Sequence, residues 1–357
     1  MYIYGDRKMK FLKYFLAFIC LSVLLIFILL RIPSFQDRLF DRVMTLPSNN
    51  LPKEDALTAV VCGSRSPLPG PGAQACILVK AGNDIYVVDM GDGSAANIRK
   101  WSIPYNQVRA VLFTHLHSDH ISDLADFHLG SWIAQNRGSK LNVYGPKGVD
   151  LVTEGFEKAY QLDYQYRYEH HGKAIAPIAV AGFNPVTIDA DQSIVLKKDG
   201  LTITVFEVSH NPIKPAFGYR FDYKDRSIVI SGDTSYDENL IKKSQDADVL
   251  FHDALSINII ERMQTFMEEI GRDSTLKILE DVKEYHATTL EAAKAANEAN
   301  VTHLVLYHLV PAPNTFISKN MFTRGMNDVR KEWTLSEDGT MVILPLNSKD
   351  IIISSIN

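Results

Sequence analysis

The stretch at residues 114–120 reads THLHSDH, and it places three histidines and an aspartate within six positions of a chain that has only 11 histidines. It follows the apolar run VRAVLF at 108–113, which is typical of a buried strand, so we expect it where that strand ends and a helix begins. Along an extended segment His115 and His117 point to the same side. Imidazole nitrogens combined with a carboxylate suit zinc, manganese or iron, so the stretch predicts a metal site.

Three further residues of ligand type stand at the ends of apolar runs. His210 ends LTITVFEVSH, Asp233 ends SIVISGD, and His308 ends THLVLYH. A single histidine at a strand end is more often structural than functional. Three such residues in the same position relative to their strands, together with the cluster at 114–120, favour one shared site.

Runs rich in Val, Ile, Tyr and Phe recur along the chain and predict strands. Helices are expected between several of them, at 122–135 and at 288–300, where Thr288 or Thr289 would cap the second. Apolar strands alternating with helices predict sheets covered by helices on the outside. The predicted strands are 57–63, 75–81, 84–90, 108–113, 140–145, 201–209, 216–223, 227–233, 247–253, 302–308 and 340–346.

These motifs resemble those of a known family. His115–Leu–His117–Ser–Asp119–His120 is similar to the HxHxDH signature of the metallo-β-lactamase superfamily. Three later motifs are similar to those of the branch that contains ribonuclease Z and the zinc-dependent arylsulfatases. They are His210, the GDT sequence Gly232–Asp233–Thr234, and His308 after an apolar strand. The resemblance covers residues 58–345 and implies an α/β fold, the four-layer αβ/βα sandwich.

The resemblance also implies a ligand set for two zinc ions, with manganese or iron as alternatives. His115, His117 and His210 would hold one ion, and Asp119, His120 and His308 the other. Asp233 would bridge the two ions, which offsets their mutual repulsion. A hydroxide shared by the ions would be the nucleophile. We expect Asp119 to be a catalytic residue as well as a metal ligand.

Two more residues resemble an acid and a histidine of that branch. His286 would protonate the leaving oxygen and Asp253 would orient its ring. Asp253 stands where ribonuclease Z has a glutamate. Because the aspartate side chain is shorter, the sequence leaves open whether it reaches the His286 ring. A purely structural role for His286, as a cap of the helix that follows, is the alternative.

Several features favour a small ester substrate, such as an aryl sulfate or a phosphodiester, over a nucleic acid. Only 22 residues separate His210 from Asp233, which leaves no room for the tRNA-gripping arm of ribonuclease Z, and the net charge is −5. The expected function is therefore an arylsulfatase- or phosphodiesterase-like hydrolase, with a homodimer left open. The alternatives are a ribonuclease Z-like tRNA 3′ endonuclease, a lactonase or β-lactamase, and a non-enzymatic membrane scaffold with a vestigial site. The tyrosine-rich segment at 150–200 is expected to be either a flap over the metals or a surface insertion.

The N-terminus predicts a membrane anchor, because residues 14–30 contain no charged side chain. We expect a cytoplasmic tail and transmembrane anchor at 1–31, a juxtamembrane helix and linker at 32–55, the hydrolase domain at 56–346, and a C-terminal tail at 347–357. The basic residues before the span predict an extracytoplasmic hydrolase domain, which is periplasmic if the source is bacterial. Cys62 and Cys76 would then either pair or remain two small buried strand residues.

Overall fold

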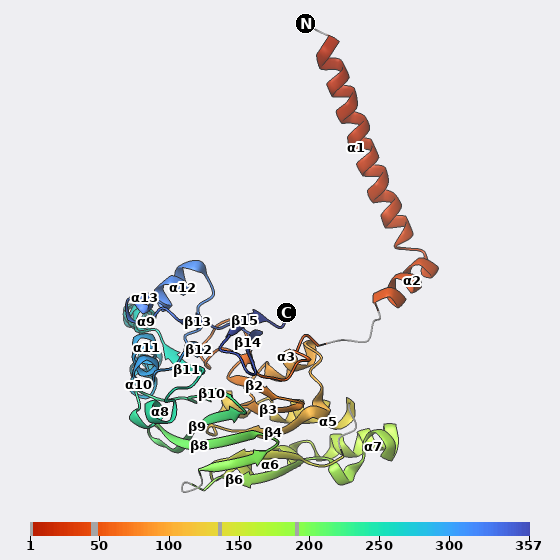
Figure 1. Ribbon diagram of the computed structural model, residues 1–357. Coiled ribbons are helices and arrows are strands. Elements are labelled where there is room, and N and C mark those ends of the chain that lie inside the picture. Colours follow the sequence, from red (N-terminus) through yellow and green to blue (C-terminus); the bar gives the residue numbers. More distant parts are fainter. Residues whose placement is uncertain (1–2, 44–48, 135–137, 190–192) are drawn as a thin grey trace. The chain divides into compact units, whose positions relative to one another are not determined.

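A computed structural model describes residues 3–43, 49–134, 138–189 and 193–357 (Figure 1). The chain divides into two compact units, Met1–Ser48 and Asn49–Asn357. The first unit holds α1 (Ile3–Leu29) and α2 (Pro33–Val43). By length and composition, Lys10–Leu29 is apolar enough to cross a membrane, with a mean hydropathy of 2.6. A signal sequence near an N-terminus passes the same test.

The second unit contains two β-sheets. The first has eight strands in the order β15-β14-β1-β2-β3-β4-β5-β6, and the second has seven in the order β13-β12-β11-β10-β9-β8-β7. The strands are β1 (Ala56–Gly63), β2 (Cys76–Ala81), β3 (Asp84–Val88), β4 (Val108–Leu112), β5 (Leu141–Gly145), β6 (Phe183–Thr187), β7 (Ile194–Lys198), β8 (Leu201–His210), β9 (Ile213–Tyr223), β10 (Arg226–Ile230), β11 (Val249–Leu255), β12 (His303–Val310), β13 (Trp333–Leu335), β14 (Thr340–Pro345) and β15 (Ile352–Ser355).

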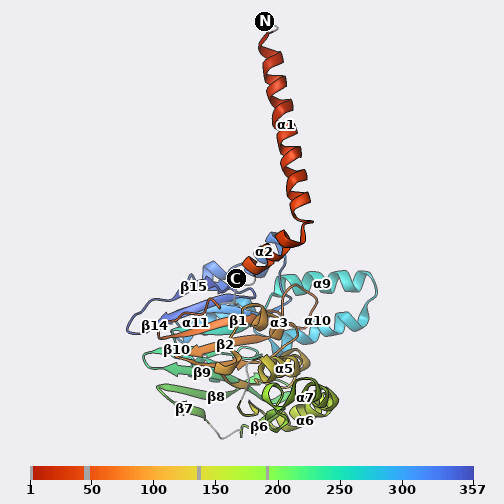
Figure 2. The same ribbon diagram turned by 90° about the vertical axis from the view of Figure 1, so that its right-hand side faces the viewer.

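Helices cover the outer face of each sheet, which gives four layers (Figures 1 and 2). Leu57, Ile77, Phe221 and Phe251 belong to the core between the sheets, and other clusters join each sheet to its helices. This is the predicted αβ/βα sandwich. The helices are α3 (Ser94–Lys100), α4 (Ser118–Ile121), α5 (Leu124–Ala134), α6 (Val149–Ala159), α7 (Gln161–Ile175), α8 (Glu238–Lys243), α9 (Ile257–Glu269), α10 (Asp273–Tyr285), α11 (Thr289–Glu298), α12 (Phe316–Phe322) and α13 (Met326–Val329), with 3₁₀ turns at Tyr105–Gln107 and Ile178–Val180.

Parallel pairing brings the ends of several strands to one edge of the sandwich. β3, β4, β5 and β6 run parallel in the first sheet, and β10, β11, β12 and β13 run parallel in the second. Polar residues that follow parallel strands therefore gather at the carboxyl edge of each sheet, where α/β proteins bind their ligands.

The helices α9 and α10 form an antiparallel hairpin between β11 and α11 (Figure 2). The turn between them contains Gly271 with a φ of 66°, a left-handed conformation that a glycine adopts without strain. The amides of Gly271 and Arg272 donate to the carbonyls of Glu268 and Met267 and so close the end of α9. The next helix, α11, begins with the predicted cap, because the Thr288 side chain accepts from the Glu291 amide.

Three expectations about the chain's organisation need revision or are now decided. Residues 347–357 are not a separate tail, because β15 pairs with β14 and extends the first sheet. The segment at 150–200 forms α6, α7, β6 and β7 in its described part, rather than a flap over the site. Cys62 and Cys76, which the sequence left open, form a disulfide with their Cα atoms 4.9 Å apart.

Candidate metal centre

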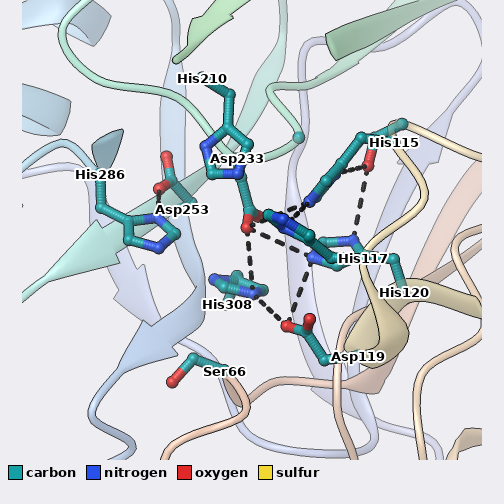
Figure 3. A network of polar contacts seen from close by, with 12 residues as sticks. Ser66, His115, His117, Asp119, His120, His210, Asp233, Asp253, His286 and His308 are labelled. Atoms are coloured by element: carbon teal, nitrogen blue, oxygen red, sulfur yellow. Dashed lines mark hydrogen bonds and ion pairs between the residues drawn. The ribbon is translucent and has the colours of Figure 1, made fainter. Parts of the chain in front are cut away.

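The seven predicted ligands lie together at the carboxyl edge of the two sheets (Figure 3). All except His117 are buried, with at most 6% of each residue exposed. They come from the β4–α4 connection together with α4, the end of β8, the turn after β10, and β12. These are His115, His117, Asp119, His120, His210, Asp233 and His308.

The first predicted ligand set forms one compact group. His115, His117 and His210 each offer a ring nitrogen within 4.8 Å of the others. The His115 Nε2 and His117 Nδ1 atoms are 2.9 Å apart. Two imidazole nitrogens at this distance direct lone pairs toward each other unless a proton or a cation lies between them, so this pair is suited to sharing a cation.

The second predicted set forms a neighbouring group of Asp119, His120 and His308, and Asp233 stands between the two groups. The Asp233 Oδ2 atom lies 3.9 Å from His115 Nε2, 3.3 Å from His120 Nε2 and 3.4 Å from His308 Nε2. One carboxylate therefore faces both groups, as a bridging ligand must.

The protonation preferences of the first group fit a metal centre. Burial lowers the pKa of His115 well below its ordinary value and also lowers the pKa values of His117 and His210, which favours the neutral imidazole that binds metals. In the second group, burial opposes protonation of His120 and His308, but the Asp233 carboxylate outweighs it and raises their pKa values, so a cation there would replace protons. Burial opposes ionisation of Asp233, but His308 and His120 outweigh it and hold its pKa well below the usual range. The buried Asp233 Oδ1 and His308 Nδ1 atoms have no hydrogen-bond partner among the described residues, so ligand capacity remains in the cluster.

A residue that the sequence analysis missed holds part of this centre in place. Asp89 is fully buried directly after β3, and its Oδ2 atom lies 2.9 Å from His120 Nδ1. The Thr114 amide and hydroxyl both donate to the same carboxylate, at 2.8 Å each. A carboxylate on Nδ1 fixes the imidazole so that Nε2 faces the centre. The position of Asp89 at the end of the predicted strand 84–90 is the signal that could have revealed it.

The histidine and acid predicted for proton transfer also meet. Asp253, on β11, is fully buried, and its Oδ2 atom lies 2.8 Å from His286 Nδ1, so the shorter acid does reach the ring. The amide of Ala287 donates to the Thr234 carbonyl, which ties the His286 segment to the turn that carries Asp233. With Nδ1 engaged, Nε2 is the His286 atom left for a substrate (Figure 3).

A cavity of about 260 Å³ opens onto the cluster. One wall is polar and contains His117, Asp119, His210, Asp233, His286 and His308. The other wall is largely apolar and comes from α10, the β1–β2 connection and the end of β12: Ile278, Val282, Tyr285, Pro67, Leu68 and Val310. No residue of the described part of 150–200 lines this cavity, which agrees with a surface insertion.

The family follows from a sequence comparison. A family model described as a beta-lactamase superfamily domain matches residues 77–309. The chain belongs to the metallo-β-lactamase superfamily. Among curated relatives, Ribonuclease Z of Mycolicibacterium gilvum (strain PYR-GCK) is 30% identical, with 71% of this chain and 85% of the relative covered. Ribonuclease Z of Mycobacterium bovis (strain BCG / Pasteur 1173P2) is 32% identical, with 72% and 87% covered.

Solved structures agree on the fold of this superfamily member. The metallo-beta-lactamase fold protein YhfI from Bacillus subtilis has a TM-score of 0.58 at 20% identity and covers 81% of this chain and 100% of its own. Human tRNase Z, short form, has a TM-score of 0.57 at 19% identity, with 81% and 100% covered. Membership of this family and the similarity to the two relatives confirm the prediction that the chain is a metal-dependent hydrolase of ester bonds.

The expected substrate is wrong. From the sequence we expected a small-molecule ester and considered a nucleic acid unlikely, but relatives across more than two thirds of the chain are named Ribonuclease Z, so they act on RNA. The comparisons therefore favour the ribonuclease Z-like alternative over the arylsulfatase-like assignment. The missing arm and the net charge of the whole chain, on which this prediction rested in part, do not exclude RNA at the site.

Proposed function

We propose that this protein is a dizinc phosphodiesterase of the ribonuclease Z type that cleaves RNA. The observation that carries the proposal is the arrangement of His286 and Asp253 beside the seven predicted ligands, in a chain 30–32% identical to proteins named Ribonuclease Z. His115, His117 and His210 would hold one ion, Asp119, His120 and His308 the other, and Asp233 both. When bound, the two ions would supply activated water and positive charge for the anionic phosphodiester.

The protein's own residues would then divide the remaining work. The cavity positions the phosphodiester against the polar wall, and the Asp253 carboxylate holds the Nδ1–H of His286 so that Nε2 faces the leaving oxygen. His286 donates its Nε2 proton to that oxygen as the bond to phosphorus breaks, and Asp253 holds the ring in the orientation that this transfer needs.

The test uses the purified full-length chain and an end-labelled RNA that has both paired and unpaired segments. We expect cleavage that stops when a chelator removes the metal, resumes when zinc or manganese is added back, and is absent in Asp233→Asn. DNA of the same sequence serves as the matched substrate control. A fully metal-loaded protein that leaves the RNA intact would overturn the proposal.

We also propose that α1 anchors the protein in a membrane and that the hydrolase unit lies on the extracytoplasmic side. The length of the apolar helix and the basic residues before it support this placement. The Cys62–Cys76 disulfide adds support, because such bonds persist in oxidising compartments and are rare in the cytosol. Alkaline phosphatase folds to its active form only outside the cytoplasm, so its fusion after Asn357 reports the orientation. The fusion should be active in bacterial cells, and an inactive fusion would contradict the proposed orientation.

A further inference from the structure

The apolar wall of the cavity has no task in the chemistry described above. It is continuous with an apolar cluster in which Leu68 and Val310 pack with residues of the α9–α10 hairpin, including Val282 and Tyr285. Ile278 extends this wall and is 50% exposed. Apart from the Tyr285 hydroxyl, the side chains of this wall offer no hydrogen-bond donor or acceptor. The wall can therefore contact the face of a flat or apolar group, but it cannot form hydrogen bonds with the polar edge of that group.

The position of the wall identifies the part of the substrate that meets it. Tyr285 ends α10 and is followed directly by His286, whose ring centroid lies 4.9 Å from that of Tyr285. His286 faces the oxygen that leaves phosphorus. The wall therefore begins on the leaving-group side of the cleaved bond, and a group attached to the leaving oxygen would extend along α10.

We propose that this wall, formed by Ile278, Val282, Tyr285 and Leu68, binds the base of the nucleotide on the leaving-group side of the cleaved bond. The inference rests on the proposed RNA phosphodiesterase function. A base inside a duplex is stacked on both faces and paired along its edge, so only an unpaired nucleotide can lay a face on the wall. The substrate class is therefore RNA that is unpaired at the cleavage site, with little preference among the four bases.

The reaction that this placement serves is a simple hydrolysis. The oxygen of water joins phosphorus, the bond from phosphorus to the oxygen of the leaving nucleotide breaks, and that oxygen takes the proton from His286 Nε2. The proton released by the attacking water restores His286 by way of solvent. The base on the wall takes no part in these steps and holds the leaving oxygen near His286.

The test compares three labelled RNA substrates cleaved at one unpaired site: one unmodified, one abasic on the 5′ side and one abasic on the 3′ side. The chemical end of each product shows which nucleotide carried the leaving oxygen. In the wild-type chain, the missing base on that side should lower kcat/KM about 5- to 100-fold, the usual range for one stacked base, and the missing base on the other side much less.

Variants connect the effect to the wall. Ile278→Ser and Leu68→Ser should reduce the ratio of unmodified to abasic kcat/KM toward one by slowing the unmodified RNA, with metal content unchanged. Tyr285→Phe should keep the wild-type ratio, because it retains the ring. Phe266→Ser is the matched control, since Phe266 is an apolar residue of the same hairpin, 53% exposed, that does not line the cavity.

The outcomes separate this inference from the function on which it rests. If the wild-type chain does not cleave the unmodified RNA, the proposed function fails and the inference fails with it. If the chain cleaves that RNA but both abasic substrates react at the same rate as the unmodified one, the inference alone is overturned. The same conclusion follows if the ratio is unchanged in both Ile278→Ser and Leu68→Ser.

Discussion

The two walls of the cavity are built in different ways. The polar wall comes mainly from strand ends of both sheets, where buried residues hold one another through contacts such as that between Asp233 and His120, 3.3 Å apart. The apolar wall comes mainly from connections, namely the α9–α10 hairpin and the segment between β1 and β2. The rigid sheets thus place the groups of the reaction, while the connections shape the space that the substrate enters. Changes to the polar wall should therefore abolish activity, and changes to the apolar wall should alter substrate preference.

The largest effect is expected from the residue that joins the two ligand groups. Asp233→Asn removes the charge shared by both groups, so we expect loss of bound metal and a fall in kcat/KM of more than about 10⁴-fold. Metal analysis and RNA cleavage measure the two losses. Asp199→Asn, at an aspartate whose side chain is 81% exposed, should change neither. A metal-loaded and active Asp233→Asn protein would contradict the bridging role.

The next effect concerns proton transfer at the junction of the two walls. His286→Ala should lower kcat about 10²- to 10⁴-fold without loss of metal, because a general acid contributes about that much. The double variant with Asp253→Asn should be no slower than His286→Ala alone, since the two residues act as a unit. His170→Ala, in an exposed histidine of α7, is the control. A double variant much slower than either single variant would show that the two act separately.

A smaller effect is expected from the buried carboxylate that orients one ligand. Asp89→Asn leaves His120 in place but weakens the acceptor on its Nδ1 atom, so metal affinity should fall about 10- to 100-fold. Titration with a competing chelator measures this affinity. Excess metal should restore most of the activity in Asp89→Asn, and a variant that excess metal cannot rescue would contradict a purely orienting role.

The smallest effect on chemistry is expected at the base of the apolar wall. The Cys62–Cys76 disulfide closes the segment that carries Leu68, with a sequence separation of 14. Replacing both cysteines with alanine should lower the free energy of unfolding by about 3 kcal/mol, as closure of a loop of this length implies. Denaturant unfolding measures this loss. Metal content should stay at the wild-type value, and its loss would show that the polar wall depends on the loop.

The sequence revealed the central strands and the ligands because both carry strong local signals. Each run rich in Val, Ile, Tyr and Phe that predicted a strand forms one. The four strands that were missed, β6, β7, β13 and β15, are the outer strands of the two sheets. Outer strands are short and partly exposed, so they lack the continuous apolar run of a buried strand. In β6, for example, FNPVT has only its first residue buried.

The substrate-facing side of the site could not be read in the same way. Ile278 and Val282 lie in an amphipathic helix whose pattern is typical of any helix packed on a core, and only the fold brings them beside His286. Asp89 gave a weak signal, a single acid at a strand end. Ligand residues share a chemical type that can be recognised along the chain, whereas the residues of an apolar wall have no such mark.

The central claim is that side chains from four separate segments hold two metal ions at the edge of the sandwich. Crystals of the full-length chain grown with zinc, measured by anomalous X-ray scattering at the zinc edge, test it directly. We predict two peaks, one about 2.0–2.2 Å from ligand atoms of His115, His117 and His210 and one at the same distance from Asp119, His120 and His308, with Asp233 reaching both. Peaks elsewhere, or no peak within the cluster, would contradict the account.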